Sequence, residues 1–298
     1  MIKEHIMRNA VSVFAILLVA GFLPQAAAQE FDDNQFEVLS EPLYECIYSY
    51  RINVAKDADA PVTEVYNTLL QVGSSCAKFC DYTTYWIDSL AQRANVQDSI
   101  RKEYMDKKNR SLYHFDAEIY QNYPQGKMTT VDIMAPNIFT YQEAAFPVQW
   151  ELTQDTTTVC GYVCNKAVAE YGGRKWTAWY AADIPVPYGP WKFTGLPGLV
   201  LAATDSEGIH SFTAISFRKS DGIGILKEKN ARLVTTDRSK FIKNKNSFEQ
   251  DPMNNIPIEA ISQMEVVKYG PGPQDNNIFI NGVRLRIRPN GYLPLELK

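Results

Sequence analysis

Histidine is the scarcest residue of this 298-residue chain, with three in all. Only His114 and His210 lie beyond the first 28 residues, so a Ser-His-Asp site would have to use one of them. His114 stands in an alternating stretch beside Asp116 and His210 follows a predicted turn, and both contexts are typical of surface residues. The sequence also lacks G-x-S-x-G, H-E-x-x-H and P-loop motifs, which excludes the best-known signatures of hydrolases and nucleotide-binding enzymes.

An excess of positive charge is also missing. The chain has 30 Lys and Arg residues against 34 Asp and Glu residues, for a net charge of −4. A nucleic-acid surface needs a basic patch, so we expect no nucleic-acid partner. No long apolar run follows the first 28 residues, and none of the later segments is predicted to cross a membrane. We predict that residues 29–298 form a single domain.

The amino-terminal residues have the order of regions typical of a secretory signal peptide. Lys3 and Arg8 precede an apolar stretch at residues 10–23, and three alanines follow at residues 26–28. The stretch is shorter than the ~20 residues that a spanning helix needs, although an uncleaved anchor helix is the alternative. We predict that residues 1–28 are a signal peptide and that the mature protein lies in the periplasm, at the cell surface or outside the cell.

Cysteine is present in an odd number. An exported protein meets an oxidising compartment, where disulfides are the default and an odd count leaves one thiol over. We predict at least one disulfide, which joins Cys46 or a member of the 76/80 pair to Cys160 or Cys164. If Cys160 and Cys164 lie on one strand, they are ~13 Å apart and cannot bond to each other. The two C-x3-C pairs are looser than usual zinc ligand spacing, so we predict neither a metal nor another cofactor. The five cysteines are Cys46, Cys76, Cys80, Cys160 and Cys164.

Tyrosine and phenylalanine are plentiful, which favours a β-rich chain. Residues 44–54 alternate as a strand, with Cys46, Tyr48 and Tyr50 on one face and Ile47 on the other.

Turn signals predict three hairpins, centred on the pairs Gly172-Gly173, Glu207-Gly208 and Asn281-Gly282. Residues 81–108 carry apolar residues at helical spacing, and residues 238–263 are polar enough for a long surface loop. We therefore predict an α+β fold that is mainly antiparallel β, with a curved or half-barrel-like sheet and one principal helix within residues 81–108.

The most distinctive segment is a Gly- and Pro-rich turn that leads into an apolar strand. Its core is Gly195-Leu196-Pro197-Gly198-Leu199, preceded by Gly189-Pro190-Trp191-Lys192-Phe193 and followed by Val200-Leu201. Two further segments precede this core, residues 176–180 and residues 183–185. This pattern resembles the GLPGLI family of exported bacterial proteins, although Val200 replaces the isoleucine of the family name. The family is named for its motif, so the resemblance implies no catalytic residue.

The motif also has a physical interpretation. Pro197 fixes its own backbone and extends Leu196, while Gly195 and Gly198 allow positive φ or a close approach of another backbone. We expect a strand with Leu199, Leu201 and Ala203 on one face and Val200 and Ala202 on the other, both largely buried. The loop before the strand either fills the end of the core or forms the rim of a groove. The candidate binding residues are Trp179, Tyr180, Asp183, Tyr188, Trp191 and Phe193.

These observations favour a non-catalytic binding, carrier or assembly factor of the cell envelope. Its expected partner is an envelope protein, a peptide or a lipid, because rigid aromatic side chains bury area at low entropic cost. The alternative is a hydrolase or a thiol-based redox enzyme that uses acidic residues or a free cysteine.

Overall fold

The computed structural model describes residues 36–54, 62–91, 115–229, 233–268, 276–286, 288 and 291–298. All of them belong to one unit, Asp33–Lys298. The predicted signal peptide, His114 and the second half of the predicted helix, residues 92–108, lie outside the described residues. Within the described ranges, no helix combines the length and the apolar character that a membrane span requires.

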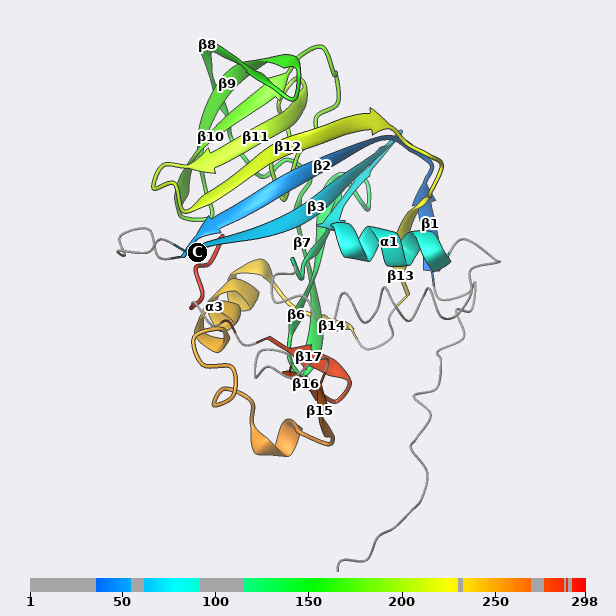
Figure 1. Ribbon diagram of the computed structural model, residues 1–298, viewed down its shortest axis with the longest axis vertical. Coiled ribbons are helices and arrows are strands. Elements are labelled where there is room, and N and C mark those ends of the chain that lie inside the picture. The colour runs from blue at the N-terminus through cyan, green and yellow to red at the C-terminus, as the bar shows by residue number, and fades with distance from the viewer. Residues whose placement is uncertain are drawn as a thin grey trace, which may run out of the picture. The chain divides into compact units, whose positions relative to one another are not determined.

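A curved, open sheet of twelve strands dominates this unit (Figure 1). Neighbouring strands are antiparallel except β14 and β7, and the two end strands, β14 and β8, do not pair with each other. In spatial order the strands are β14 (Leu233–Thr235), β7 (Asn137–Ala144), β6 (Lys127–Met134), β5 (Glu118–Gln121), β4 (Ala77–Asp81), β3 (Thr63–Gly73), β2 (Pro42–Asn53), β12 (His210–Lys219), β11 (Leu199–Asp205), β10 (Arg174–Ala181), β9 (Tyr162–Tyr171) and β8 (Glu151–Val159).

Smaller elements surround the large sheet. Strand β1 (Phe36–Ser40) pairs with β13 (Ile225–Glu228), and β16 (Asn276–Ile280) pairs with both β15 (Met264–Lys268) and β17 (Val283–Leu285). The helices of the described residues are α1 (Tyr82–Ala91), α3 (Arg238–Phe248) and the short 3-10 helix η2 (Ile258–Ala260). The fold is thus mostly β, and the α+β prediction is corrected, whereas the antiparallel and curved character of the sheet is confirmed.

All three predicted hairpins are confirmed. Gly172-Gly173 joins β9 to β10, and Asn281-Gly282 joins β16 to β17. The third turn, at Glu207-Gly208, joins β11 to β12. Gly172 and Gly173 both have positive φ, which is the conformation that a Gly-Gly pair supplies in a tight hairpin turn.

Strand β2 separates the main core from a smaller one. Cys46, Tyr48 and Tyr50 belong to the main core cluster, whereas Ile47 packs against the cluster on the opposite face. Alternation along a strand places successive side chains on opposite faces, and the predicted assignment of faces is confirmed. The opposite face is covered by α1, which supplies Tyr85 to that smaller cluster (Figure 1).

The segment predicted as a long surface loop contains α3. Asp237 caps this helix, because its carboxylate accepts a hydrogen bond from the backbone N–H of Lys240 at 2.8 Å. Phe241, Ile242 and Phe248 are buried beneath it. Phe241 and Ile242 pack on β7, and Phe248 packs in a separate cluster with Ala135, so the loop prediction is wrong for residues 238–248.

The strand after the motif follows the prediction, and so do the two glycines before it, each by a different one of the two predicted alternatives. Every residue from Leu199 to Ala203 is buried, as predicted. Gly195 has a φ of +93°, whereas Gly198 is absent from the positive-φ residues of the described chain. Gly198 is instead required by packing, since a Cβ there would lie 2.2 Å from the carbonyl oxygen of Ala181.

The predicted disulfide is not formed, because all five cysteines are free. Cys80 packs on the α1 face of the sheet, whereas Cys46 and Cys164 belong to the main core on the opposite face. Cys160 has a φ of +50° and lies with Gly161 in the turn between β8 and β9. The arrangement considered from the sequence, with Cys160 and Cys164 on one strand, is therefore not found. Cys76 is buried just before β4.

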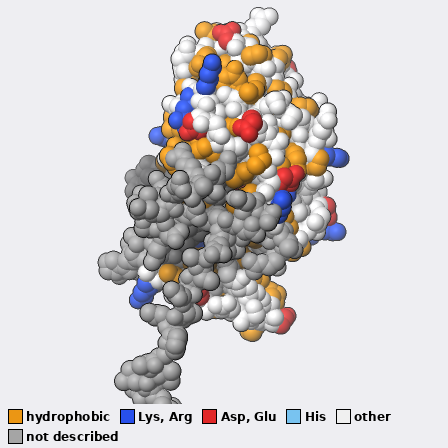
Figure 2. All heavy atoms as spheres, turned by 90° about the vertical axis from the view of Figure 1, so that its right-hand side faces the viewer, with side chains coloured by type: hydrophobic (Ala, Val, Ile, Leu, Met, Phe, Trp, Pro, Cys, Tyr) orange, Lys and Arg blue, Asp and Glu red, His pale blue; other side chains and the backbone are white. Residues whose placement is uncertain are grey.

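The face drawn in Figure 2 has a mixed surface. Where the described residues are visible, hydrophobic side chains lie scattered among polar ones, and charged side chains of both signs occur singly or in small groups. This part of the surface therefore presents no broad patch of one charge.

Candidate functional site

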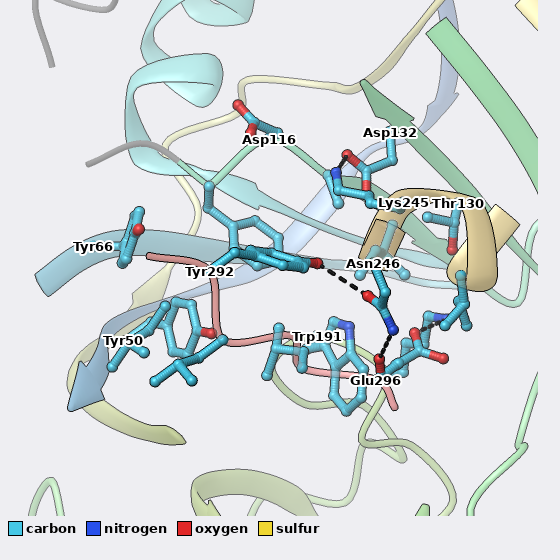
Figure 3. Close-up of a pocket in the computed structure, with 18 of the residues that line it drawn as sticks. Tyr50, Tyr66, Asp116, Thr130, Asp132, Trp191, Lys245, Asn246, Tyr292 and Glu296 are labelled. Atoms are coloured by element: carbon cyan, nitrogen blue, oxygen red, sulfur yellow. Dashed lines mark hydrogen bonds and ion pairs between the residues drawn. The ribbon is translucent and has the colours of Figure 1, made fainter. Parts of the chain in front are cut away.

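A cavity of about 110 Å³ lies between the large sheet and a cover made by α3 and the carboxyl-terminal residues (Figure 3). Strands β2, β3, β5, β6 and β7 supply its sheet side. The motif contributes two adjacent residues, Trp191 and Lys192. Residues from eight separate parts of the chain therefore meet around one cavity.

Aromatic rings form much of the wall. The ring of Tyr50 stacks on that of Tyr66 at 5.3 Å and meets the edge of Phe115 at 5.8 Å. Tyr292 projects across the cavity toward Asn246 (Figure 3), and its hydroxyl donates to the Oδ1 of that residue at 3.4 Å. The seven aromatic residues of the lining are Tyr50, Tyr66, Phe115, Tyr141, Trp191, Phe241 and Tyr292.

The C-terminal segment, residues 291–298, is held in place by partners that are distant in the sequence. The backbone N–H of Leu297 donates to Gly172 O at 2.6 Å, and Asn246 Nδ2 donates to Glu296 O at 2.9 Å. Arg174 donates to Pro294 O at 2.7 Å. A Cβ on Gly172 would lie 3.1 Å from the side chain of Glu296, so the hairpin glycine also makes room for this segment.

One buried ion cluster surrounds Lys192, which is 1% exposed. Its Nζ lies 2.6 Å from Glu296 Oε1 and 2.7 Å from Glu143 Oε1, and it donates to the hydroxyl of Tyr141 at 3.0 Å. Arg238 binds the other oxygen of Glu296. Burial alone would lower the pKa of Lys192, but the Glu296 carboxylate and its neighbours raise it well above its usual value. The lysine is therefore charged.

A second ion cluster joins α3 to β6 and to Arg288, three residues after the end of β17. Lys245 Nζ lies 2.5 Å from Asp132 Oδ1 and 3.8 Å from Glu249. Arg288 lies 3.0 Å from Glu249 and 3.9 Å from Asp116. Burial raises the pKa of Asp132, an effect that the Lys245 ammonium opposes.

Two polar groups on β6 have hydrogen-bonding capacity left. Thr130 is 2% exposed, and its hydroxyl has no hydrogen-bond partner within the part of the chain that the structure describes. Asp132 uses Oδ1 for its bonds from Lys245 and from the backbone of Ile133, and neither bond is made to Oδ2. Both side chains line the cavity, two residues apart on one face of the strand.

The predicted binding residues do not form one groove. Trp191 lines the cavity, and the ring of Phe193 packs in the core against the ring of Trp191, with 5.1 Å between their centroids. Tyr188 is buried and donates to Ser75 O. Tyr180 is buried in the core. Trp179 and Asp183 lie outside the lining, the first half-buried and the second exposed.

His210 is not the surface residue that the turn context suggested, since it is fully buried. Its Nε2 lies 3.2 Å from Pro294 O, which can only accept, so Nε2 carries the proton. Its Nδ1 then accepts a hydrogen bond from the hydroxyl of Tyr50 at 2.9 Å. Burial, assisted by the nearby Arg174, lowers the pKa of His210 to about 3, so the ring is neutral.

Sequence reasoning missed most of the polar lining. The sequence around Thr130, Asp132 and Lys245 does not mark them as site residues, because the groups that surround each of them come from distant parts of the chain. Of the charged lining residues, Lys192 stood inside a recognised motif. Among the described residues, no three His, Cys, Asp or Glu side chains are grouped to hold a metal ion.

Fold and site together define a mostly β protein with a buried, aromatic and charged cavity. A family model described as "Protein of unknown function (Porph_ging)" matches residues 170–202, which include the hairpin at Gly172, strand β10 and the motif. No curated protein matches the chain. Two solved structures, "Structure of PNGF-II in P21 space group" and "Structure of PNGF-II in C2 space group", are similar over 78% of this chain, with 13% and 14% identity and TM-scores of 0.46 and 0.45. The chain spans only 37% and 35% of their lengths.

Proposed function

We propose that this chain is a non-catalytic binding protein of the cell envelope and that its ligand occupies the cavity. The observation that carries the proposal is the buried hydroxyl of Thr130 in the cavity wall, which has no hydrogen-bond partner among the described residues. A buried polar group without a partner costs about 1–3 kcal/mol, and a bound molecule can remove that cost.

The state of the other groups favours binding over catalysis. The described lysines and Arg288 of the lining are already paired with carboxylates. Burial raises the pKa of Cys46 to about 12 and also raises the pKa of Cys76 and Cys164. A thiol reacts as the thiolate, so these three cysteines are poor candidates for the redox alternative.

Export and family assignment belong to the same proposal. Residues 1–28 act as a signal peptide, and the mature chain works in the periplasm or outside the cell. The matched family model falls on the motif region, which supports assignment to the GLPGLI family. Mass spectrometry of the exported protein should find a mature amino terminus at Gln29; a chain that still begins at Met1 would contradict the export proposal.

The binding proposal is tested by filling the cavity. Ala117 lines it, and Ala117→Leu should occupy part of its volume, whereas the exposed Ala182→Leu is the matched control. We expect compounds of about ten non-hydrogen atoms or fewer to raise the Tm of the wild type and of the control but not of Ala117→Leu. At a concentration 100 times Kd, binding adds about 2.7 kcal/mol to stability.

The same samples distinguish binding from turnover. Each compound that raises the Tm is recovered after incubation, and its NMR spectrum is compared with that of the starting material. We expect it unchanged. A product that forms with the wild type and not with Ala117→Leu would replace the binding proposal with an enzymatic one.

A further inference from the structure

The cavity already holds three cations of the chain itself, and all three have the same chemical setting. Each lies over the face of an aromatic ring and beside carboxylates, which is the arrangement that favours a positive charge. The distances to the ring centroids are 4.9 Å from Lys192 to Tyr141, 5.1 Å from Arg288 to Tyr292 and 5.7 Å from Lys245 to Phe241.

Thr130 and Asp132 offer a further position for a cation, beside a carboxylate in the wall of the same cavity. The Thr130 hydroxyl has no partner among the described residues, and Asp132 Oδ2 takes no part in the bonds that Lys245 and Ile133 make to Oδ1. A protonated amine brings three N–H donors and no acceptor. It can donate both to the Thr130 hydroxyl and to Asp132 Oδ2 while its carbon skeleton lies against the aromatic wall.

An anion would find a poorer site. Lys192 is already held by two carboxylates, Glu143 and Glu296, at 2.7 and 2.6 Å. Arg288 likewise lies between Glu249 and Asp116. A ligand carboxylate would have to displace one of these partners and leave it as a buried, unpaired charge. The pKa of Lys192, of Lys245 and of Arg288 is raised despite burial, which indicates that the described carboxylates make the field around these cations negative.

We propose that the cavity binds a small organic cation, a protonated amine with an apolar body, whose nitrogen lies beside Thr130 and Asp132. This inference rests on the proposed binding function. A volume of about 110 Å³ holds about seven to eleven water-sized groups at 10–15 Å³ each, and this limits the ligand to a similar number of non-hydrogen atoms.

Three probes of nearly equal size test the charge preference: hexylamine, hexanol and hexanoate. Isothermal titration of the purified mature protein at neutral pH should give hexylamine an affinity at least tenfold higher than that of hexanol, with hexanoate the weakest. Raising the salt concentration should leave the hexylamine affinity nearly unchanged, because a buried pair is screened little.

Two substitutions locate the nitrogen. Thr130→Val removes a hydroxyl that has no partner in the described ranges, so the variant should fold normally, and Asp132→Asn removes the charge while keeping the shape. Each should weaken hexylamine at least tenfold and leave hexanol unchanged. The matched controls are Thr156→Val on the exposed edge strand β8 and Asp183→Asn in the exposed loop, which should change neither affinity.

The outcomes separate the two proposals. Hexanol or hexanoate that binds as tightly as hexylamine, with the binding abolished in Ala117→Leu, would overturn the cation assignment and leave the binding function standing. Thr130→Val with unchanged hexylamine affinity would also overturn it. Binding of none of the three probes, together with no Tm increase by any compound tested, would overturn both.

Discussion

The aromatic corner, which is the ring cluster of Trp176, Trp191 and Phe193 beneath the motif, shares Trp191 with the cavity beside it. The two regions differ in whether their side chains are fully packed against one another. In the corner the aromatic rings pack against one another. The ring centroid of Phe193 lies 4.7 Å from that of Trp176 and 5.1 Å from that of Trp191. In the cavity, charges are paired around a space and the hydroxyl of Thr130 has no partner within the described chain. The corner is complete without a ligand, so under the binding proposal the motif positions the site and the scattered residues of the cavity hold the ligand.

The strongest test of this difference between the two regions is at Lys192, which follows Trp191 in the sequence and lines the cavity. Lys192→Met should lower the free energy of unfolding by about 3–5 kcal/mol, because it removes one partner of a buried ion cluster and leaves the others uncompensated. Among the described residues, Glu143 and Glu296 would keep Arg238, and Glu143 would also keep the hydroxyl of Tyr171. Urea denaturation of the purified protein measures the effect.

Lys175→Met is the matched control, because that lysine is 73% exposed and lies 3.7 Å from an exposed Glu170. It should change stability by less than about 1 kcal/mol. Equal losses in the two variants would mean that the buried cluster contributes no more than a surface pair, and the description of the cavity as a charged, desolvated site would be wrong.

A steric change tests the corner without touching the cavity. Gly198→Val should destabilise the protein by about 3 kcal/mol, since a Cβ would lie 2.2 Å from Ala181 O and the backbone must shift. The exposed neighbouring Ala182→Val should change stability by no more than about 0.5 kcal/mol. Ligand affinity of the folded fraction should be the same for both, and thermal unfolding with titration checks the two expectations. A Gly198→Val protein as stable as the wild type would show that this close approach is not required.

The features that the sequence predicted well are those with a local physical cause. A Gly-Gly pair favours a hairpin turn whatever surrounds it, and the turn between β9 and β10 was found where expected. Alternation on β2 likewise separates Tyr48 from Ile47 by geometry alone. Helix α3 was missed because its polar residues outnumber the buried ones, Phe241 and Phe248 among them, and its stability comes from docking on β7.

The site could not be predicted because its chemistry is non-local. Asp132 on β6 acquires Lys245 across 113 positions, and Lys192 acquires Glu296 across 104. Nothing near Thr130 in the sequence indicates that its hydroxyl lacks a partner within the described residues, since that depends on how α3 and the C-terminal segment cover β6. His210 was misjudged for the same reason, because Pro294 buries it from the far end of the chain.

The smallest expected effect lies at the boundary between the two regions, where His210 joins Tyr50 to the C-terminal segment. Its pKa is about 3 when folded against about 6.5 when unfolded, so the unfolded chain binds the extra proton between these values. This contribution to stability is present above pH 6.5 and is lost as pH falls toward 3, by about 2 kcal/mol between pH 7.5 and pH 5. His210→Gln keeps a donor for Pro294 but cannot titrate, so the stability difference between wild type and variant should narrow by that amount as pH falls. Urea denaturation at the two pH values measures it. Parallel stability curves would mean that His210 is accessible to protons in the folded protein, and the C-terminal segment would then be a loose cover over the cavity instead of a packed one.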